Sequence, residues 1–234
     1  MEKRLAVMQP YIFPYIGYYQ LINCVDKFIF YDDVNFIKNG WINRNNILVN
    51  GQKHLFSIPL KAQSSNKKIL EIEIDQSKKW PTKFLNTIYI SYKKAVHFNE
   101  IYTLLETIIS NKNSKISEIS KDSVVKICEY LEIQTELVAS SELYNNAHLS
   151  SSDRIIDLCL HENANCYVNA IGGIDLYDKA NFSSNNIDLC FLKPVLSGYC
   201  QFGINFLPGL SIIDVLMFNS KMQIREMLNQ YELV

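Results

Sequence analysis

Two apolar runs near the start of the chain, separated by a loop and a helix, limit the fold more than any other feature of the sequence. Residues 5–8 form the first run and residues 26–33 the second, and both predict buried strands. Residues 18–22 between them are typical of the first turns of a helix. A strand, a helix and a second strand in this order form a βαβ unit with parallel strands. The sequence therefore predicts an α/β fold with a Rossmann-like, mostly parallel sheet.

The loop between the first strand and the helix is the first candidate site. Pro10 and Pro14 fix the chain direction, and Gly17 stands where the loop must bend closely onto the start of the helix. Tyrosine rings and hydroxyls suit a wet, shaped pocket at the carboxyl end of a strand. A proline-rich turn whose rings merely cover the core is the alternative. The candidate substrate-binding residues here are Gln9, Tyr11, Tyr15 and Tyr18.

The second strand ends in the candidate catalytic groups, Asp32 and Asp33. A right-handed crossover places the carboxyl ends of both strands at the same edge of the sheet. We therefore expect the two carboxylates to lie near the opening loop. There, either could act as a general base or anchor an amine.

The polar segment at residues 35–46 combines cationic, aromatic and amide side chains. Lys38 and Arg44 could hold phosphates or a carboxylate, because ammonium and guanidinium groups donate charge-assisted hydrogen bonds to such anions. Trp41 could stack on a ring, and Asn43 could orient hydroxyl or amide groups of a ligand. A solvated loop of asparagine-rich turns is the competing interpretation.

The middle of the chain predicts a β-hairpin insertion followed by a helical segment. Residues 45–75 hold an Asn-Gly pair flanked by apolar runs, a strong hairpin signal. Residues 69–75 then alternate apolar and acidic side chains, which is typical of a half-exposed strand. Residues 80–132 repeat apolar side chains at helical spacing. Since no internal repeat or long linker interrupts the chain, we expect residues 1–234 to form a single α/β domain.

Two later places add candidate substrate-binding residues. The strand predicted at residues 166–171 is followed at once by a glycine pair, which lets backbone amides approach a ligand, although a plain tight turn is equally compatible. Near the end of the chain, a carboxylate within a mostly apolar helix needs a partner or a water-filled cleft. The candidates are Gly172, Gly173, Asp175, Ser211 and Asp214.

Composition excludes several classes of function. A formal net charge of −1 argues against general binding to the nucleic-acid backbone. The chain has no apolar run near the ~20 residues that cross a bilayer and no signal-peptide core, so we expect a cytoplasmic protein without a membrane span.

The six cysteines form no Cys-x-x-Cys pair and are typical of buried thiols. Cys159, His161 and Cys166 match no zinc pattern, so we predict no metal site. His97 is expected at a helix junction; whether it or a cysteine takes part in catalysis is left open.

The usual phosphate-binding fingerprints are absent from the sequence. It contains no Gly-x-Gly-x-x-Gly, no Walker-type lysine loop and no Gly-x-Ser-x-Gly elbow. The run Phe13-Pro14-Tyr15-Ile16-Gly17-Tyr18 is similar in layout to the HIGH-type loop of the nucleotidyltransferase and aminoacyl-tRNA synthetase superfamily. That motif has a histidine, a ligand of the ATP phosphates, where this chain has Tyr18.

A more specific resemblance rests on four segments spread over the whole chain. These are Gln9-Pro10-x-x-x-Pro14-x-x-Gly17-Tyr18, Asp32-Asp33-Val34-x-Phe36, Trp41-x-Asn43-Arg44-Asn45 and Leu210-Ser211-Ile212-Ile213-Asp214. Together they resemble the WbqC-like family. The resemblance implies a bacterial cytoplasmic protein, often encoded among surface-polysaccharide (O-antigen) genes, that decorates an amino sugar. It brings no catalytic residue with it.

Three functional hypotheses follow. The first is an enzyme that modifies a nucleotide-linked amino sugar, as an N-acyl or aminoacyl transferase whose partners are the sugar and an acyl donor. The second is an ATP-using adenylyltransferase or ligase, which would need ATP with magnesium. The third is a non-catalytic protein that binds a nucleotide-linked sugar. The sequence assigns no cofactor, and it leaves a homo-oligomer open.

Overall fold

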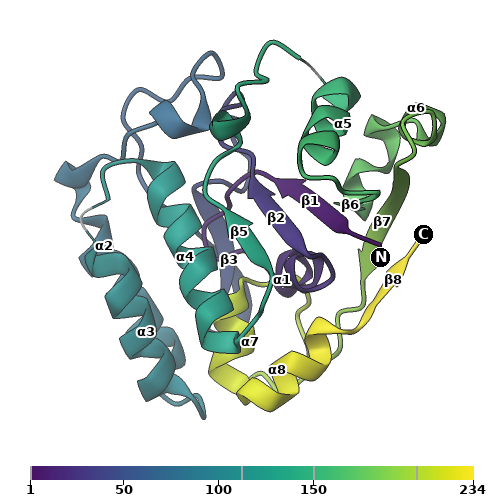
Figure 1. The fold of residues 1–234 in the computed structure, drawn as a ribbon. Helices are drawn as coiled ribbons and strands as arrows, with labels where there is room; N and C mark the ends of the chain where they lie inside the picture. The colour runs from purple at the N-terminus through teal and green to yellow at the C-terminus, as the bar shows by residue number, and fades with distance from the viewer. Residues whose placement is uncertain (1, 112, 150, 204) are drawn as a thin grey trace.

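A six-stranded, mostly parallel sheet forms the centre of the molecule in the computed structural model, which describes residues 2–111, 113–149, 151–203 and 205–234. Across the sheet the strands are β5 (Glu136–Val138), β2 (Lys27–Phe30), β1 (Arg4–Met8), β6 (Cys166–Ala170), β7 (Asp188–Pro194) and β8 (Tyr231–Leu233) (Figure 1). Only β8 runs antiparallel to its neighbour. The predicted α/β fold is confirmed. The strand order reverses between β1 and β6, so the loop after β1 lies at the point where ligands enter sheets of this kind.

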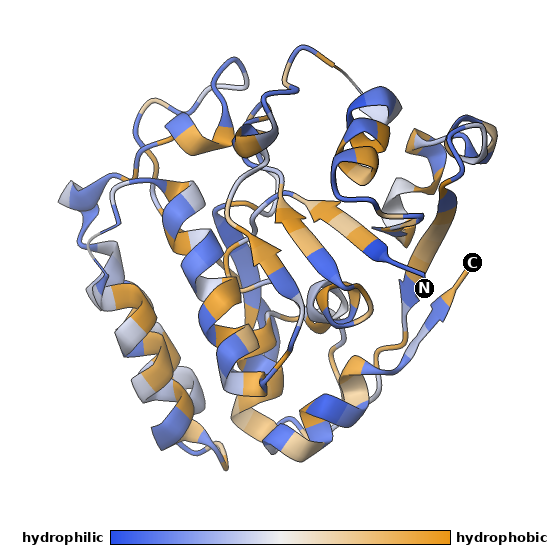
Figure 2. Cartoon of the chain, viewed as in Figure 1, coloured by the Kyte–Doolittle hydropathy of each residue, from blue (hydrophilic) through white to orange (hydrophobic). Residues whose placement is uncertain are grey.

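Helices cover both faces of this sheet, as the alternation of side chains along β1 requires. Ala6 belongs to one buried cluster, with α1 (Ile16–Asn23), whereas Leu5 and Val7 belong to the other, with α5 (Ser151–His161) and α6 (Lys179–Ser183). Figure 2 shows the resulting hydrophobic strands between partly polar helices.

The predicted helical segment consists of α2 (Trp80–Tyr92), α3 (Phe98–Ser110) and α4 (Ile116–Leu131). Pro81 occupies the first turn of α2, where its missing N–H costs nothing. The chain then closes the same face with α7 (Ile212–Phe218) and α8 (Lys221–Leu228). No helix in the described ranges is both long and apolar enough to cross a bilayer.

The predicted hairpin consists of β3 (Arg44–Val49) and β4 (Gln52–Ser57), which form a separate antiparallel pair. Asn50 and Gly51 have φ values of 50° and 75°, as a turn of type I′ requires. The half-exposed strand expected at residues 69–75 is wrong. Residues 69–71 form a 3₁₀ turn, and residues 73 and 74 make only isolated bridges. The backbone groups of residues 69–75 bond to three separate segments, at residues 32–34, 59–61 and 114–116. The 3₁₀ turns are η1 (Ile69–Glu71), η2 (Gln76–Lys78), η3 (Ser141–Tyr144) and η4 (Ile171–Leu176).

Candidate functional site

The loop after β1 is held in one shape by buried polar side chains from three other parts of the chain. Phe13 has a φ of 42°, a conformation that is costly for a bulky residue and needs support from its surroundings. Its N–H donates to Ser123 Oγ at 3.1 Å. Its carbonyl accepts from Asn45 Nδ2 and from Ser211 Oγ, both at 2.7 Å. Ser211 therefore fixes this loop from its position just before α7.

Further hydrogen bonds complete the support of this loop. They run from Ile12 N to Ile42 O (3.1 Å), from Ile212 N to Pro14 O (2.9 Å) and from Tyr18 Oη to Gln9 O (2.9 Å). Because these partners are themselves buried or part of helices, the loop is preorganised rather than free to adapt. The Tyr18 ring is buried and its hydroxyl is used within the protein.

The outer side of the loop forms an aromatic cleft of about 240 Å³. It is lined by Tyr11, Pro14, Tyr15, Trp41, Asn45 and Gly209. Burial raises the pKa of Tyr11 and of Tyr15, so both hydroxyls stay protonated and can donate to a ligand at neutral pH. The structure thus brings Tyr11, Tyr15 and Trp41, three of the predicted binding residues, to one cleft.

Gly17 shapes this cleft by leaving room for a ring. A Cβ at Gly17 would lie 2.4 Å from Cε2 of Tyr15, which is closer than real Cβ atoms come. The Tyr15 ring therefore lies over the first turn of α1, in a position that only glycine permits.

The polar segment after β2 supports the other wall of the cleft. Arg44 donates from Nε to the carbonyl of Gly40 at 2.8 Å and from Nη2 to the carbonyl of Asn39, and its guanidinium lies 5.9 Å from the Trp41 ring centre. Asn43 donates to the carbonyl of Ile58 at 2.9 Å. Arg44 and Asn43 therefore donate to backbone carbonyls of the protein. Lys38 and Trp41, by contrast, are exposed and accessible to a ligand.

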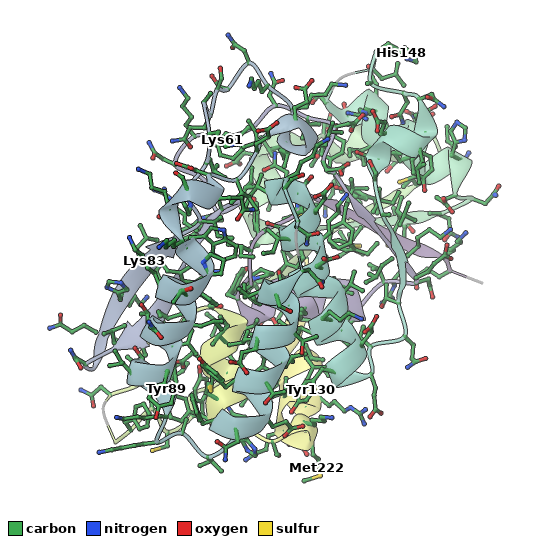
Figure 3. The ribbon with its side chains drawn as sticks, turned by 90° about the vertical axis from the view of Figure 1, so that its left-hand side faces the viewer. Lys61, Lys83, Tyr89, Tyr130, His148 and Met222 are labelled. Carbon is green, nitrogen blue, oxygen red and sulfur yellow. The ribbon has the colours of Figure 1, made fainter. Side chains whose placement is uncertain are left out.

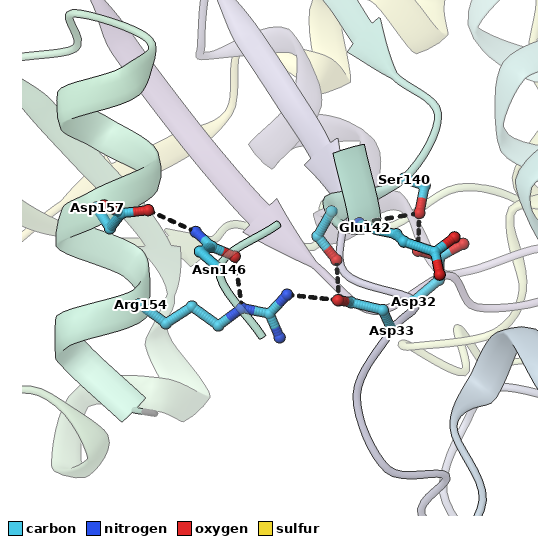
Figure 4. A network of polar contacts seen from close by, with 8 residues as sticks. Asp32, Asp33, Ser140, Glu142, Asn146, Arg154 and Asp157 are labelled. Carbon is cyan, nitrogen blue, oxygen red and sulfur yellow. Dashed lines mark hydrogen bonds and ion pairs between the residues drawn. The ribbon is translucent and has the colours of Figure 1, made fainter. Parts of the chain in front are cut away.

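The candidate catalytic carboxylate Asp33 lies in a buried ion pair (Figure 4). Nη2 of Arg154, from α5, donates to both oxygens of Asp33 at 2.7 and 2.6 Å, and Ser141 donates to the first of them. Nε of Arg154 donates to Asn146 at 2.9 Å. The guanidinium also lies 4.8 Å from the ring centre of Tyr31, at the end of β2. Asp33 and Arg154 therefore join α5 to the carboxyl end of β2.

Asp32 points to a different set of partners. Its carboxylate accepts from Lys121 Nζ, on α4, at 2.8 Å and from Ser140 Oγ at 2.5 Å. Only about 1% of Asp32 and 4% of Asp33 is exposed. A catalytic role for either carboxylate stays a prediction. Their contacts make both of them links between the sheet edge and its surrounding helices.

Asp214 belongs to a third, separate network. It accepts from Tyr92 Oη at 2.8 Å and from Tyr199 Oη and Gln201 Nε2 at 2.6 Å. Burial raises the pKa of Asp214, and the three donors oppose that rise. Asp214 thus has the partners that its place in an apolar helix demands. In the residues described, no group of three His, Cys, Asp or Glu side chains is arranged to hold a metal ion.

The glycine pair after β6 lies in η4. Gly172 and Asp175 are exposed, and Gly173 is buried against Asn169, whose Nδ2 would lie 2.4 Å from a Cβ at that position. None of the three lines the aromatic cleft. Their proposed part in ligand binding stays a prediction.

Sequence reasoning left out several residues that build the site. Asn45 was part of the family pattern but was not among the binding residues, and the small polar Ser123 gave no signal on its amphipathic helix. Arg154 and Lys121 gave only a weak signal, because a cation on a helix is ordinarily solvated. Their partners lie 121 and 89 positions away in the sequence.

Comparison with known proteins gives one family. The model of the WbqC-like protein family matches residues 9–226. The Mycobacterium tuberculosis protein named "Uncharacterized protein Rv1507c" is 30% identical over 220 residues, which cover 93% of this chain and 94% of that protein. No solved structure matches this chain.

Proposed function

This chain belongs to the WbqC-like protein family, and we propose that it is an enzyme that modifies a nucleotide-linked amino sugar. The proposed reaction is transfer of an acyl or aminoacyl group to the amine of the sugar, during synthesis of a surface polysaccharide such as O-antigen. The proposed partners are the sugar nucleotide and the acyl donor, and the proposed location is the cytoplasm.

The observation that carries this proposal is the aromatic cleft beside the clamped loop. Aromatic faces pack against the apolar face of a sugar or against a nucleobase, and protonated tyrosine hydroxyls donate to ligand oxygens. A cleft of about 240 Å³ is smaller than the ~300–1,000 Å³ of sites for drug-sized ligands. We therefore place a single ring in the cleft and the remainder of the ligand along the surface, where Lys38 is accessible to its phosphates.

Acyl transfer to an amine also needs a proton acceptor. The amine nitrogen forms a bond to the acyl carbon, the bond to the donor's leaving group breaks, and the nitrogen loses a proton. Asp32 and Asp33 are the proposed acceptors. Each carboxylate receives hydrogen bonds from a cation and a serine in the structure. In this proposal, one of those donors moves away before the proton is taken.

Adenylyl transfer receives less support from the geometry. Tyr18 stands where the related loops carry a phosphate-binding histidine, and it is buried with its hydroxyl bonded to Gln9. It therefore cannot reach a phosphate without leaving the core.

Calorimetric titration with dTDP- and UDP-linked amino sugars tests the cleft. We expect the unmodified protein to bind, and Trp41→Ala to lose about tenfold or more in affinity, because stacking is worth roughly 0.5–1.5 kcal/mol beyond the area that a ring buries. Trp41→Phe keeps an aromatic ring and should bind with near-normal affinity. Tyr89→Ala, which removes a half-exposed ring on α2, is the control. Equal affinity in Trp41→Ala and the control would refute the site. Tight binding of the sugar nucleotide without consumption of acyl-CoA donors would instead indicate a non-catalytic binding protein.

A further inference from the structure

A second concave surface lies between the hairpin and α2. This groove, which we call the β4–α2 groove, has a volume of about 420 Å³ and shares no lining residue with the aromatic cleft. One wall is β4 and the segment after it, and the other is the first two turns of α2. None of its lining residues takes part in the proposed reaction.

The wall formed by β4 is an unpaired strand edge. In an antiparallel pair, every second residue turns its N–H and C=O away from the partner strand. On β3 these outward groups are identified by their contacts, since Leu48 N donates to Tyr92 Oη and Asn46 O accepts from Ser211 N. Across the ladder, Leu48 pairs with Lys53 and Asn46 pairs with Leu55.

The alternation continues to Ser57, opposite Arg44. Lys53, Leu55 and Ser57 therefore turn their backbone groups outward from β4, and no hydrogen bond described outside the ladder uses them. All three residues are exposed. A free edge of this kind can accept one more strand.

The floor of the groove is aromatic and its rim is cationic. Phe56, Trp80 and Phe84 form the floor, with the Phe56 and Phe84 ring centres 5.0 Å apart. Lys78 and Lys83 line the rim, and Figure 3 shows Lys83 projecting from α2.

The rim carries more positive charge than its neighbours balance. His54 also lines the groove, and Lys53 and Lys79 adjoin it. Among the described ion pairs, none involves Lys53, Lys78, Lys79 or Lys83. The nearby carboxylate of Asp75 accepts from the hydroxyl of Ser77 at 2.6 Å and from its N–H at 3.1 Å, and it interacts with Lys78. Its single negative charge offsets only one of these four lysines.

We infer that the β4–α2 groove binds an acidic, extended segment of another polypeptide, which adds to β4 as a third strand. The outward backbone groups of Leu55 and Ser57 supply the hydrogen bonds of the new ladder. Apolar side chains on one face of the segment pack on Phe56 and Phe84, and its acidic side chains meet the lysines of the rim. A second copy of this chain fits less well, because pairing β4 with itself would bring two lysine-rich rims together.

The probe for this inference is a fluorescein-labelled peptide of alternating glutamate and valine, about six residues or ~20 Å long when extended, the length of the β4 wall. Fluorescence polarisation with the full-length protein should detect saturable binding. A matched peptide with lysine in place of glutamate should not bind. A glutamate-valine peptide methylated on alternate amide nitrogens should bind about tenfold or more weakly, because it cannot complete the ladder.

Two variants of the protein separate the strand edge from the charged rim. Leu55→Pro removes an outward N–H that has no partner in the hairpin, so it should reduce binding and leave the fold intact. Lys83→Glu should reduce binding more at low salt than at high salt. Lys94→Glu makes the same change in charge on an exposed lysine outside the groove and should leave affinity unchanged. Circular dichroism of each variant verifies folding.

Amide hydrogen exchange locates the peptide. Bound peptide should slow exchange at Leu55 and Ser57. Absence of binding by the glutamate-valine peptide, or binding that Leu55→Pro leaves unchanged, would overturn the inference. It would also be overturned by concentration-dependent dimerisation that Leu55→Pro abolishes, which would make a second copy the occupant.

Discussion

Removing the charge of Asp33 is the most informative perturbation that the structure offers. The side chains of Asp33 and Arg154 are only 2% and 4% exposed, and one nitrogen of Arg154 reaches both carboxylate oxygens. In Asp33→Asn, the guanidinium stays buried without its counter-charge. Breaking a buried pair in this way typically costs about 3–5 kcal/mol. We therefore expect a large fall in the free energy of unfolding from a single change of oxygen to nitrogen.

Urea denaturation measures this fall. With an m-value of about 3 kcal/mol per molar urea, the expected loss lowers the midpoint by about 1–1.7 M. Glu232→Gln is the control, because Glu232 and its partner Lys193 are 57% and 56% exposed and such a pair contributes below about 1 kcal/mol. The double variant Asp33→Leu/Arg154→Met removes both charges and should lose less stability than Asp33→Asn. A loss below about 1 kcal/mol in Asp33→Asn would refute the reasoning.

This cost affects how a catalytic test of Asp33 must be designed. Loss of turnover in Asp33→Asn at a temperature where the variant unfolds would say nothing about proton transfer. Turnover should be measured where circular dichroism shows the variant folded. Under those conditions, an Asp33→Asn variant that is folded and inactive but keeps its affinity for the sugar nucleotide would support Asp33 as the proposed base. Full activity in both Asp32→Asn and Asp33→Asn would exclude both carboxylates as the base.

The remaining predictions concern the cleft, the buried carboxylate and the thiols. In Gly17→Ala, the new Cβ should displace the Tyr15 ring and weaken ligand binding by about tenfold, which titration calorimetry measures. Urea denaturation should show little loss of stability, because only a flexible side chain must move. Burial raises the pKa of Asp214 in the folded protein, so protonation of this carboxyl contributes stability that is present at low pH and is lost as the pH rises through the raised pKa. In urea denaturation, the free energy of unfolding of the unmodified protein should therefore increase relative to that of Asp214→Asn as the pH falls from 7 to about 4. Cys200 is exposed whereas burial raises the pKa of Cys128 to about 12, so Ellman's reagent at pH 8 should give a fast phase that Cys200→Ser abolishes.

The elements that sequence predicted well are those whose local pattern and tertiary role agree. The βαβ start, the Asn-Gly hairpin and the helices within residues 80–132 all carry a strong period or a specific turn. Residues 69–75 show the opposite case. Ile72 and Ile74 are buried, as the alternation predicts, but Leu70 is only partly buried and its neighbour Ile69 is fully buried. The backbone groups of this segment bond to several other segments instead of one partner strand. Alternation of apolar and acidic side chains therefore does not predict what the backbone pairs with, and where the backbone leaves the strand conformation it also loses the period of two.

The residues of the candidate site were predictable where a short stretch of sequence gathers several aromatic or polar side chains, as it does around Tyr11 and around Trp41. Tyr11 and Tyr15 lie on the loop that the pattern singled out, and they do line the cleft. Arg44 was expected to hold a ligand anion but holds the carbonyls of its own loop, since the fold brings those acceptors within reach first. The partners of Asp32 and Asp33 could not be found, because an ion pair between distant residues leaves no local periodicity.

Several of the residues that carry the family resemblance, from segments far apart in the sequence, meet at the loop after β1. Asn45 and Ser211 are 166 positions apart in the sequence, yet both donate to the carbonyl of Phe13. Gly17 leaves the space in which the Tyr15 ring lies. A loop with a strained residue costs stability, and so much buried polar support is unnecessary for a mere connection between a strand and a helix. The support becomes understandable if the exact shape of this loop is what the protein needs, and that shape determines the aromatic cleft. The cleft is therefore the place where the function of this chain should be sought first.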